Sequence, residues 1–279
     1  MNRSPRSSST APTFGRRRLL RDSSIVVSLG ALVAACGEGR EGLQDPGRVG
    51  VAPPRVTLPD VEVNDVVLLR TAQSLEFTAI EVYAAAAELG VLDAAGMRLV
   101  DRFVADHTEH ADQVGQLITA AGGTEFRCPN PFYMERIIGP TLDALDGTDD
   151  LLRDVLNISY ALESVAGATY QLFLREFSDP DLRTAAARIA ADETRHAAAV
   201  AIAATGAPDG YVDPQLTGGE EAIGADGVEL LFAVRSAFGR LGGTPLTVGA
   251  RDEDGARFNI SIQTPADNSY VYDHLSCSA

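Results

Sequence analysis

Apolar residues recur at helical spacing in four segments in the middle of the chain. The first covers about residues 64–89, where Asn64 or Asp65 can cap a helix and Gly90 can end it. Its mainly apolar face consists of Val67, Leu68, Thr71, Leu75, Thr78, Val82 and Leu89. The other segments cover about residues 93–121, 149–177 and 180–204. We therefore expect four long helices.

The connections between these helices differ in length. The first link has only a few residues, and Ser178-Asp179-Pro180 joins the third helix to the fourth with a cap and a proline suited to a first helical turn. Residues 122–148 are instead rich in glycine and proline, with a short helix expected between Phe132 and Leu145. Short links make neighbouring helices antiparallel. The order of hairpin, long crossover and hairpin predicts an all-α fold, an antiparallel four-helix bundle over residues 64–206.

The C-terminal residues 207–279 follow a different pattern. Four glycines mark a loop after the bundle, and Val228–Leu241 can form a short helix. Thr244–Ala250 and Ala256–Thr264 are β-like and flank a turn at residues 251–255, which predicts a β-hairpin. We expect this extension to pack on the bundle or to form a surface for a partner.

The N-terminus has the features of an export signal. Arg16-Arg17-Arg18-Leu19-Leu20-Arg21 resembles the twin-arginine motif of bacterial signal peptides. The apolar stretch Ile25–Ala35 is too short to span a bilayer, which needs about 20 residues. It ends in Val33-Ala34-Ala35-Cys36, which looks like a lipobox. The resemblance implies a signal peptide at 1–35 and a lipid-anchored, extracytoplasmic protein attached to the membrane through Cys36; an ordinary cleaved signal with a chance cysteine is the alternative.

Residues 36–63 contain glycine, proline and arginine without an apolar period, so we expect a flexible tether between the anchor and the bundle. If Cys36 carries the lipid, Cys128 and Cys277 remain. Outside the cytoplasm two such thiols are candidates for a disulfide, provided that the fold brings them together.

The charge of the chain excludes some partners. The net charge is −16, although residues 1–35 carry six arginines and only one acid, Asp22. The remainder is therefore strongly acidic. This argues against a nucleic-acid partner and against electrostatic adsorption to anionic lipid, because both need a basic face.

A duplicated motif contains three of the four histidines. The first copy reads Leu75-Glu76, Tyr83 and His107-x-x-His110, and the second reads Leu162-Glu163, Tyr170 and Glu193-x-x-His196. Each tyrosine follows its glutamate by seven residues, and the spacing from glutamate to the last histidine is 34 in one copy and 33 in the other. The segments ADHTEHADQV and ADETRHAAAV also match locally. The repetition makes the pattern far more specific than a single His-x-x-His.

Residues three apart on a helix share a face, so both His-bearing pairs can point into the core. Six side chains then meet at mid-bundle: Glu76, His107, His110, Glu163, Glu193 and His196. The pattern resembles the ferritin-like di-iron and di-manganese carboxylate proteins, which place one Glu on each of two helices and Glu-x-x-His on each of the others. The resemblance implies a dinuclear metal site, with iron expected and manganese or zinc as alternatives.

His107 departs from the family pattern, which has a bridging Glu at this position. An imidazole binds one metal ion unless it loses both ring protons, and the exchange removes one negative charge from the ligand set. We expect that loss to stabilise the reduced state of a bound metal. Mixed nitrogen and oxygen ligation suits several transition metals, so the sequence does not choose among them.

The same residues allow other interpretations. A buried glutamate needs a partner, and a Glu–His hydrogen-bond network could supply it without a metal. Tyr83 and Tyr170 lie on the face of the ligand glutamates, where they can hydrogen-bond to ligands or serve as core residues. Glu81 and Glu109 lie off that face, and His274 lies outside the duplication and is expected at the surface.

Three functions follow from these observations: a di-metal oxidoreductase of the oxidase or ferroxidase type, a metal-binding or storage protein without turnover, and a structural or interaction lipoprotein that retains only the fold. The sequence identifies no catalytic residue beyond the metal ligands. It favours an exported ferritin-like metal-binding lipoprotein.

Overall fold

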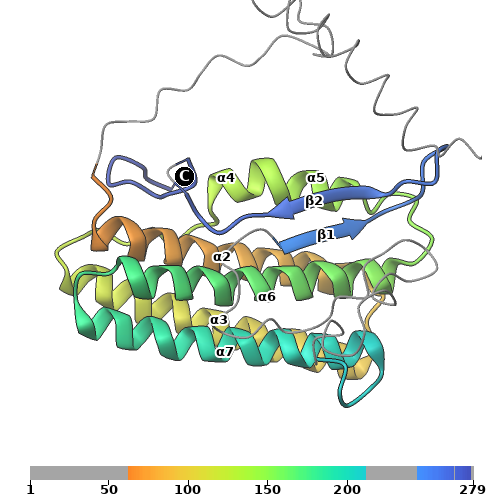
Figure 1. Ribbon diagram of the computed structural model, residues 1–279, viewed down its shortest axis with the longest axis horizontal. Coiled ribbons are helices and arrows are strands. Elements are labelled where there is room, and N and C mark those ends of the chain that lie inside the picture. The colour runs from red at the N-terminus through yellow and green to blue at the C-terminus, as the bar shows by residue number, and fades with distance from the viewer. Residues whose placement is uncertain (1–61, 212–243, 267, 278–279) are drawn as a thin grey trace, which may run out of the picture. The chain divides into compact units, whose positions relative to one another are not determined.

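The computed structural model describes residues 62–211, 244–266 and 268–277. Four long helices form the bundle (Figure 1): α2 (Asp65–Glu88), α3 (Ala94–Ala120), α6 (Leu151–Glu176) and α7 (Pro180–Thr205). The predicted all-α fold is confirmed, and each helix begins and ends within two residues of its expected bounds. The predicted signal peptide 1–35, nearly all of the predicted tether 36–63 and the predicted helix Val228–Leu241 lie outside the described residues.

Each long helix begins at a capping side chain that satisfies free backbone amides of its first turn. Asn64 accepts a hydrogen bond from the amide of Val67 at 3.0 Å. The other caps are Asp93, Asp150 and Asp179. At the far end of α7, Gly206 adopts a left-handed conformation with φ of 66°, which stops the helix.

Two helical hairpins, α2–α3 and α6–α7, pair to make the bundle (Figure 1). The crossover between them contains α4 (Pro131–Tyr133), a π-helical turn (Met134–Ile138) and α5 (Gly139–Asp143). Asn130 fastens the crossover to α2, since its backbone amide donates to the Ser74 carbonyl at 3.1 Å and its side-chain amide to the Ser74 hydroxyl at 2.9 Å.

The predicted β-hairpin is confirmed. Strands β1 (Thr244–Val248) and β2 (Phe258–Ile262) pair antiparallel, with Thr244 opposite Ile262 and Val248 opposite Phe258. Strand β1 packs on α6, and both strands lie with α4 and α5 on the α2–α6 side of the bundle (Figure 1). One apolar cluster joins these parts and includes Val82, Ile137, Ile158, Val165, Leu246, Val248 and Ile262.

The last described residues return to α2. The buried Arg70 donates a hydrogen bond to the carbonyl of Leu275, and the amide of Val271 donates to the Thr71 hydroxyl at 2.8 Å. A disulfide joins Cys128 in the crossover to Cys277, with their Cα atoms 5.9 Å apart. The C-terminal segment is therefore tied covalently to the start of the crossover.

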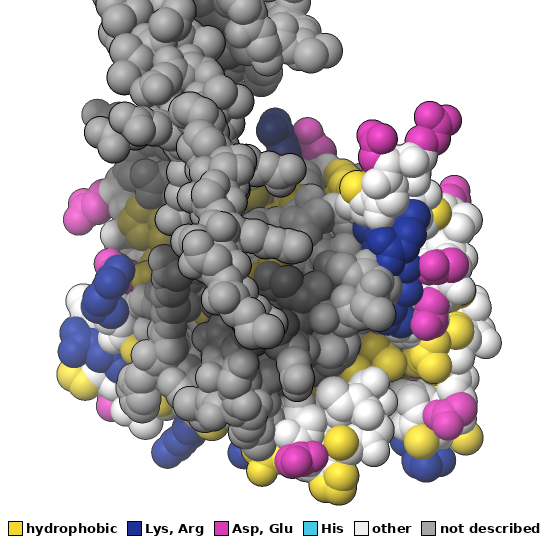
Figure 2. Space-filling view, turned by 45° about the vertical axis from the view of Figure 1, so that its right-hand side comes forward, with side chains coloured by type: hydrophobic (Ala, Val, Ile, Leu, Met, Phe, Trp, Pro, Cys, Tyr) yellow, Lys and Arg dark blue, Asp and Glu magenta, His cyan; other side chains and the backbone are white. Residues whose placement is uncertain are grey.

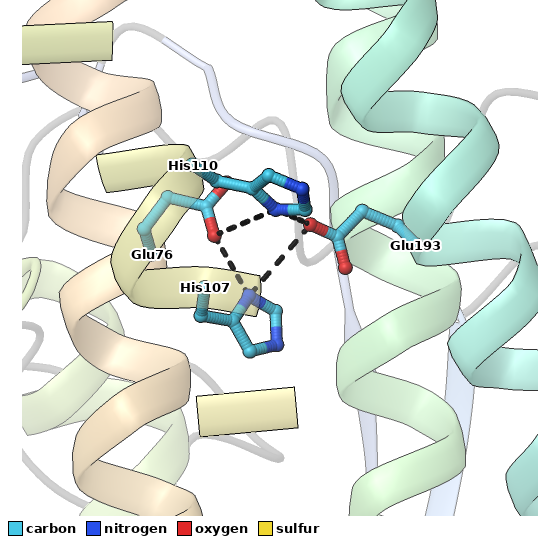
Figure 3. A group of neighbouring side chains, drawn as sticks. All are labelled: Glu76, His107, His110 and Glu193. Atoms are coloured by element: carbon cyan, nitrogen blue, oxygen red, sulfur yellow. Dashed lines mark hydrogen bonds and ion pairs between the residues drawn. The ribbon is translucent and has the colours of Figure 1, made fainter. Parts of the chain in front are cut away.

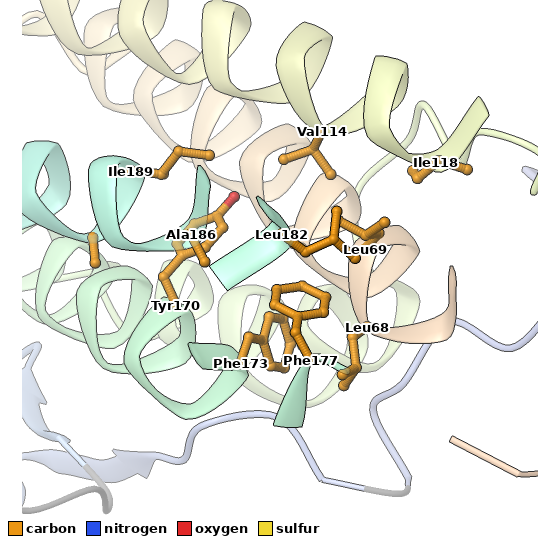
Figure 4. Close-up of a cluster of buried hydrophobic side chains, with 12 residues drawn as sticks. Leu68, Leu69, Val114, Ile118, Tyr170, Phe173, Phe177, Leu182, Ala186 and Ile189 are labelled. Atoms are coloured by element: carbon orange, nitrogen blue, oxygen red, sulfur yellow. The ribbon is translucent and has the colours of Figure 1, made fainter. Parts of the chain in front are cut away.

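Two apolar clusters fill the bundle on either side of a polar layer. One contains Leu68, Leu69, Val114, Ile118, Phe173, Phe177 and Ile189 (Figure 4). The other contains Tyr83, Val100, Phe103, Tyr160, Ala197, Val200 and Ala201. Along every helix, the polar positions of the duplicated motif fall between these clusters. Water is therefore kept from the polar layer at both ends.

The described side chains on one face of the molecule are mixed in charge. On the face shown in Figure 2, arginine and acidic side chains are interspersed with small apolar areas, and no histidine is visible among the described side chains. His107, His110 and His196 are buried. None of the described helices combines the length and the apolar character that crossing a membrane requires.

Candidate metal centre

All six side chains expected to bind metal lie together in the polar layer. Each is buried, with at most 6 % of its surface exposed. They are Glu76 on α2, His107 and His110 on α3, Glu163 on α6, and Glu193 and His196 on α7. Helical spacing explains the convergence, because residues three apart on α3 and on α7 project from one face toward the bundle axis.

The first group of four consists of Glu76, His107, His110 and Glu193 (Figure 3). Oε2 of Glu76 lies 2.7 Å from Nδ1 of His107, and Oε1 of Glu193 lies 2.9 Å from Nδ1 of His110. The cross distances are 3.8 Å between Glu76 Oε2 and His110 Nδ1, and 3.7 Å between Glu193 Oε1 and His107 Nδ1. One ligand atom from each residue therefore points at a common spot.

The second group shares two members with the first and consists of His107, Glu163, Glu193 and His196. Nε2 of His107 lies 3.2 Å from Oε1 of Glu163. Nδ1 of His196 lies 3.2 Å from Oε2 of Glu193 and 3.4 Å from Oε2 of Glu163. In each group the four ligand atoms lie within 4.8 Å of one another.

The two tyrosines of the duplicated motif contact ligand glutamates across the bundle. The hydroxyl of Tyr83 on α2 donates to Oε1 of Glu163 on α6, and that of Tyr170 on α6 donates to Oε1 of Glu76 on α2. Both tyrosines are buried. Each therefore holds a carboxylate on the opposite hairpin.

Two aspartates that contact the histidines were not predicted from the sequence. Oδ2 of Asp106 lies 3.1 Å from Nε2 of His196, and Oδ2 of Asp192 lies 3.6 Å from Nε2 of His110. The sequence held a signal, because Ala-Asp precedes His107 in one copy of the motif and Glu193 in the other. The contact runs between α3 and α7, however, so spacing along one helix does not reveal it.

The ferritin-like domain family matches residues 64–205, just over half of the 279 residues. The chain belongs to this family. No curated protein and no solved structure matches it. In this ferritin-like bundle, His107 stands where a bridging glutamate is expected from the family pattern.

The carboxylates of this ferritin-like site are ionised unequally. Burial alone would raise the pKa of Glu76, but hydrogen bonds from His107 and His110 and the charges of these rings lower it to about 2. The pKa of Glu163 is also lowered against the effect of burial, chiefly by His107. Burial raises the pKa of Glu193 at the centre, and repulsion by Glu76 adds to the rise.

The imidazoles respond in the opposite sense. Burial would lower the pKa of His110 and of His196, but the glutamates around them raise it to about 10 and to about 9. The pKa of His107 is also raised, because the charges of Glu193 and Glu163 outweigh its burial. Without metal, protons on these rings therefore balance the carboxylates.

The donor set fits a transition metal. Carboxylate and imidazole are ligands for iron, manganese and zinc. Oε2 of Glu163 is buried and accepts no hydrogen bond, its nearest partner being Nδ1 of His196 at 3.4 Å, and a bound cation would satisfy it. The aspartates beside His110 and His196 supply the outer contact that commonly orients a metal-binding imidazole.

Three other candidate residues lie outside the site. Glu81, Glu109 and His274 are exposed and belong to neither group of ligands. The ring of His274 stacks on that of Tyr272, with centroids 5.9 Å apart.

Proposed function

We propose that this ferritin-like chain is an exported lipoprotein that binds a dinuclear centre of iron or manganese and carries out an oxidase- or ferroxidase-type reaction. One observation carries the proposal. Six buried carboxylate and imidazole side chains form two overlapping four-ligand groups between apolar layers.

The residues divide into those that hold metal and those that hold the ligands. Glu76, Glu163 and Glu193 would supply carboxylates, and His107, His110 and His196 would supply imidazoles. Bound iron or manganese would supply one-electron redox chemistry toward dioxygen, peroxide or ferrous iron. The apolar layers would exclude bulk water, and the aspartates and tyrosines would fix the orientation of the ligands.

The N-terminal motifs support export and lipidation, with the arginines at 16–18 as the address and Cys36 as the acceptor of the lipid. The disulfide between Cys128 and Cys277 agrees with an oxidising compartment. Expression in a bacterium with fatty-acid labelling tests this part. Label on the membrane fraction that Cys36→Ser abolishes would support it; an unlabelled, soluble wild-type protein would refute it.

Metal content tests the centre. The purified protein is expected to hold two iron or manganese ions after anaerobic loading, and a Glu163→Ala/His196→Ala variant is expected to lose at least one. A Glu81→Ala/His274→Ala variant is the matched control, because it changes the same residue types at exposed positions. Dioxygen consumption with ferrous iron, measured on the loaded proteins, then tests turnover.

A metal-free structural or interaction lipoprotein is the second candidate. The mutual contacts of the six side chains favour it, because three protonated imidazoles already neutralise much of the carboxylate charge. In that case the wild-type protein would contain no metal after the loading treatment and chelator-free dialysis. The double variant would be less stable than wild type but would have the same metal content.

A further inference from the structure

The ring of His107 stands between the two groups of ligands. Its Nδ1 atom lies 2.7 Å from Oε2 of Glu76 and 3.7 Å from Oε1 of Glu193, in the first group. Its Nε2 atom, on the other side of the ring, lies 3.2 Å from Oε1 of Glu163, in the second group. The two nitrogens of one side chain therefore serve different groups.

Glu193 is the counterpart of His107 in the duplicated motif. Like His107, it directs one of its two ligand atoms to each group. Its Oε1 atom lies 2.9 Å from Nδ1 of His110, and its Oε2 atom lies 3.2 Å from Nδ1 of His196. Each group consequently contains one glutamate of its own, one histidine of its own, one oxygen of Glu193 and one nitrogen of His107. Both groups have two nitrogen and two oxygen donors.

We propose that His107 is a bridging ligand, with its imidazole ring linking two metal ions through Nδ1 and Nε2. This inference rests on the proposed dinuclear centre and specifies how its two halves are joined. When the second ion binds, the remaining N–H bond of the ring breaks, the freed electron pair bonds to the metal and the proton passes to solvent.

Charge is consistent with the bridge. Three glutamates carry three negative charges, and a ring that has lost both protons adds a fourth. Two divalent ions are then neutralised, as they would be by the four glutamates of the family pattern. With a neutral His107 the buried centre would keep a net positive charge, which is costly in an apolar surrounding.

The ring is held in the bridging orientation. His107 is fully buried, and its ring stacks against that of Tyr83 with centroids 5.8 Å apart. Turning the ring by half a revolution about its Cβ–Cγ bond would present carbon atoms to Glu76 and Glu163 in place of the nitrogens. Both hydrogen bonds would then be lost.

Anomalous diffraction from crystals of the protein loaded with Zn²⁺ tests the bridge directly. Two zinc peaks are expected, one bonded to each ring nitrogen of His107 at about 2.0–2.1 Å. Two peaks of which at most one is bonded to His107 would overturn the bridge and leave the dinuclear centre standing. A single peak would overturn the bridge and the dinuclear count. No peak in the bundle would overturn the proposed metal function itself.

Alanine variants test the same point in solution. If His107 bridges, His107→Ala removes a donor from both groups and should weaken both Zn²⁺-binding steps. Loss of an outer contact alone lowers metal affinity roughly 10–100-fold, so loss of a direct ligand should lower it at least that much. His110→Ala is the matched control, since it removes a donor from one group and should weaken one step. Equal effects of the two variants, with one step changed in each, would contradict the bridge. Circular dichroism checks that each variant folds, and the crystal test does not depend on the variants.

Discussion

The buried tyrosines of the duplicated motif each control one oxygen of a candidate metal ligand. Tyr83 donates to Glu163, and Tyr170 donates to Glu76, so each hydroxyl limits how its carboxylate can turn. Because outer contacts of this kind tune metal sites, removing one hydroxyl should lower metal affinity even though the hydroxyl is not itself a candidate ligand.

We predict that Tyr83→Phe lowers the affinity for Mn²⁺ roughly 10–100-fold, because Glu163 loses the donor that orients it. Competition with a chelator of known affinity measures the change. Tyr133→Phe is the matched control: its buried hydroxyl donates to the backbone carbonyl of Gln263, away from the site. If the two variants weaken Mn²⁺ binding equally, the tyrosine contact has no specific role.

At the scale of elements, Gln73 on α2 connects three parts of the structure. Its amide nitrogen donates to the carbonyl of Ala111 at 3.1 Å and to Oε2 of Glu125 at 2.9 Å. Its oxygen accepts from the amide of Phe126 at 2.7 Å. The side chain passes beside Gly115 on α3, which leaves room for it. The start of the crossover is therefore positioned by one buried amide.

Gly115→Ala should destabilise the protein, although alanine normally favours a helix. The added Cβ would come closest to Oε2 of Glu125 and would lie 2.7 Å from Nε2 of Gln73, so that these two side chains must move and give up their mutual hydrogen bond. We expect a net loss of about 1–2 kcal/mol in the free energy of unfolding, measured by urea denaturation.

Gly167→Ala on α6 is the control for this change. The new Cβ would meet Thr194 Oγ1 at 3.5 Å, an ordinary contact. Helix propensity should then dominate and stabilise the protein by about 0.5–1 kcal/mol. If both substitutions shift the unfolding free energy in the same direction, the space beside Gly115 does not hold Gln73 in place.

The helices were predictable from the sequence because their signals are local. Apolar spacing marks the buried faces, and caps such as Asn64 and Asp93 mark the starts. The π-helical turn at 134–138 gave no such local signal, and its buried Ile137 and Ile138 pack in one apolar cluster with Val82 of α2 and Ile158 of α6. The convergence of the six candidate ligands could be predicted from a repeated spacing, whereas the contacts of Asp106 and Asp192 could not, because they join different helices.

At the scale of the whole molecule, the chain closes on itself through the disulfide between Cys128 and Cys277, which are 149 residues apart in sequence. The sequence identified the pair as candidates but held no information on their distance, which depends on the path of the C-terminal segment over α2. A cross-link between distant residues restricts the unfolded chain strongly.

Replacing Cys128 and Cys277 by serine should therefore lower the free energy of unfolding by about 2–4 kcal/mol. Guanidinium denaturation of the purified variant beside wild type, with and without reductant, measures this loss. Ser276→Ala, at an exposed neighbouring position, serves as the control. Metal content should not change, because the disulfide touches none of the six ligands. A wild-type protein that is equally stable with and without reductant would contradict the prediction.

The ionisation of the candidate metal site links the stability of the whole molecule to pH. In the metal-free protein the pKa of His110 is about 10 and that of His196 about 9, both raised from 6.5. A raised histidine pKa stabilises the folded state fully below the unfolded value and ceases to do so as pH rises through the folded value. The pKa of Glu76 is lowered from 4.5 to about 2, so Glu76 affects stability at acidic pH. Its contribution to the stability of the folded state is lost as pH falls through this range.

We predict that the metal-free protein loses stability steadily between pH 6.5 and pH 10, whereas the metal-loaded protein does not. Metal replaces the ring protons, and its binding strengthens as they leave, so rising pH favours the loaded state. Urea midpoints at several pH values, with chelator and with Mn²⁺, measure both slopes. His110→Gln should flatten the metal-free slope, because it removes one of the rings whose pKa is raised in the folded state. A metal-free protein whose midpoint is constant over this range would show that the imidazoles are not protonated in the folded state, and the charge balance described for the site would then be wrong.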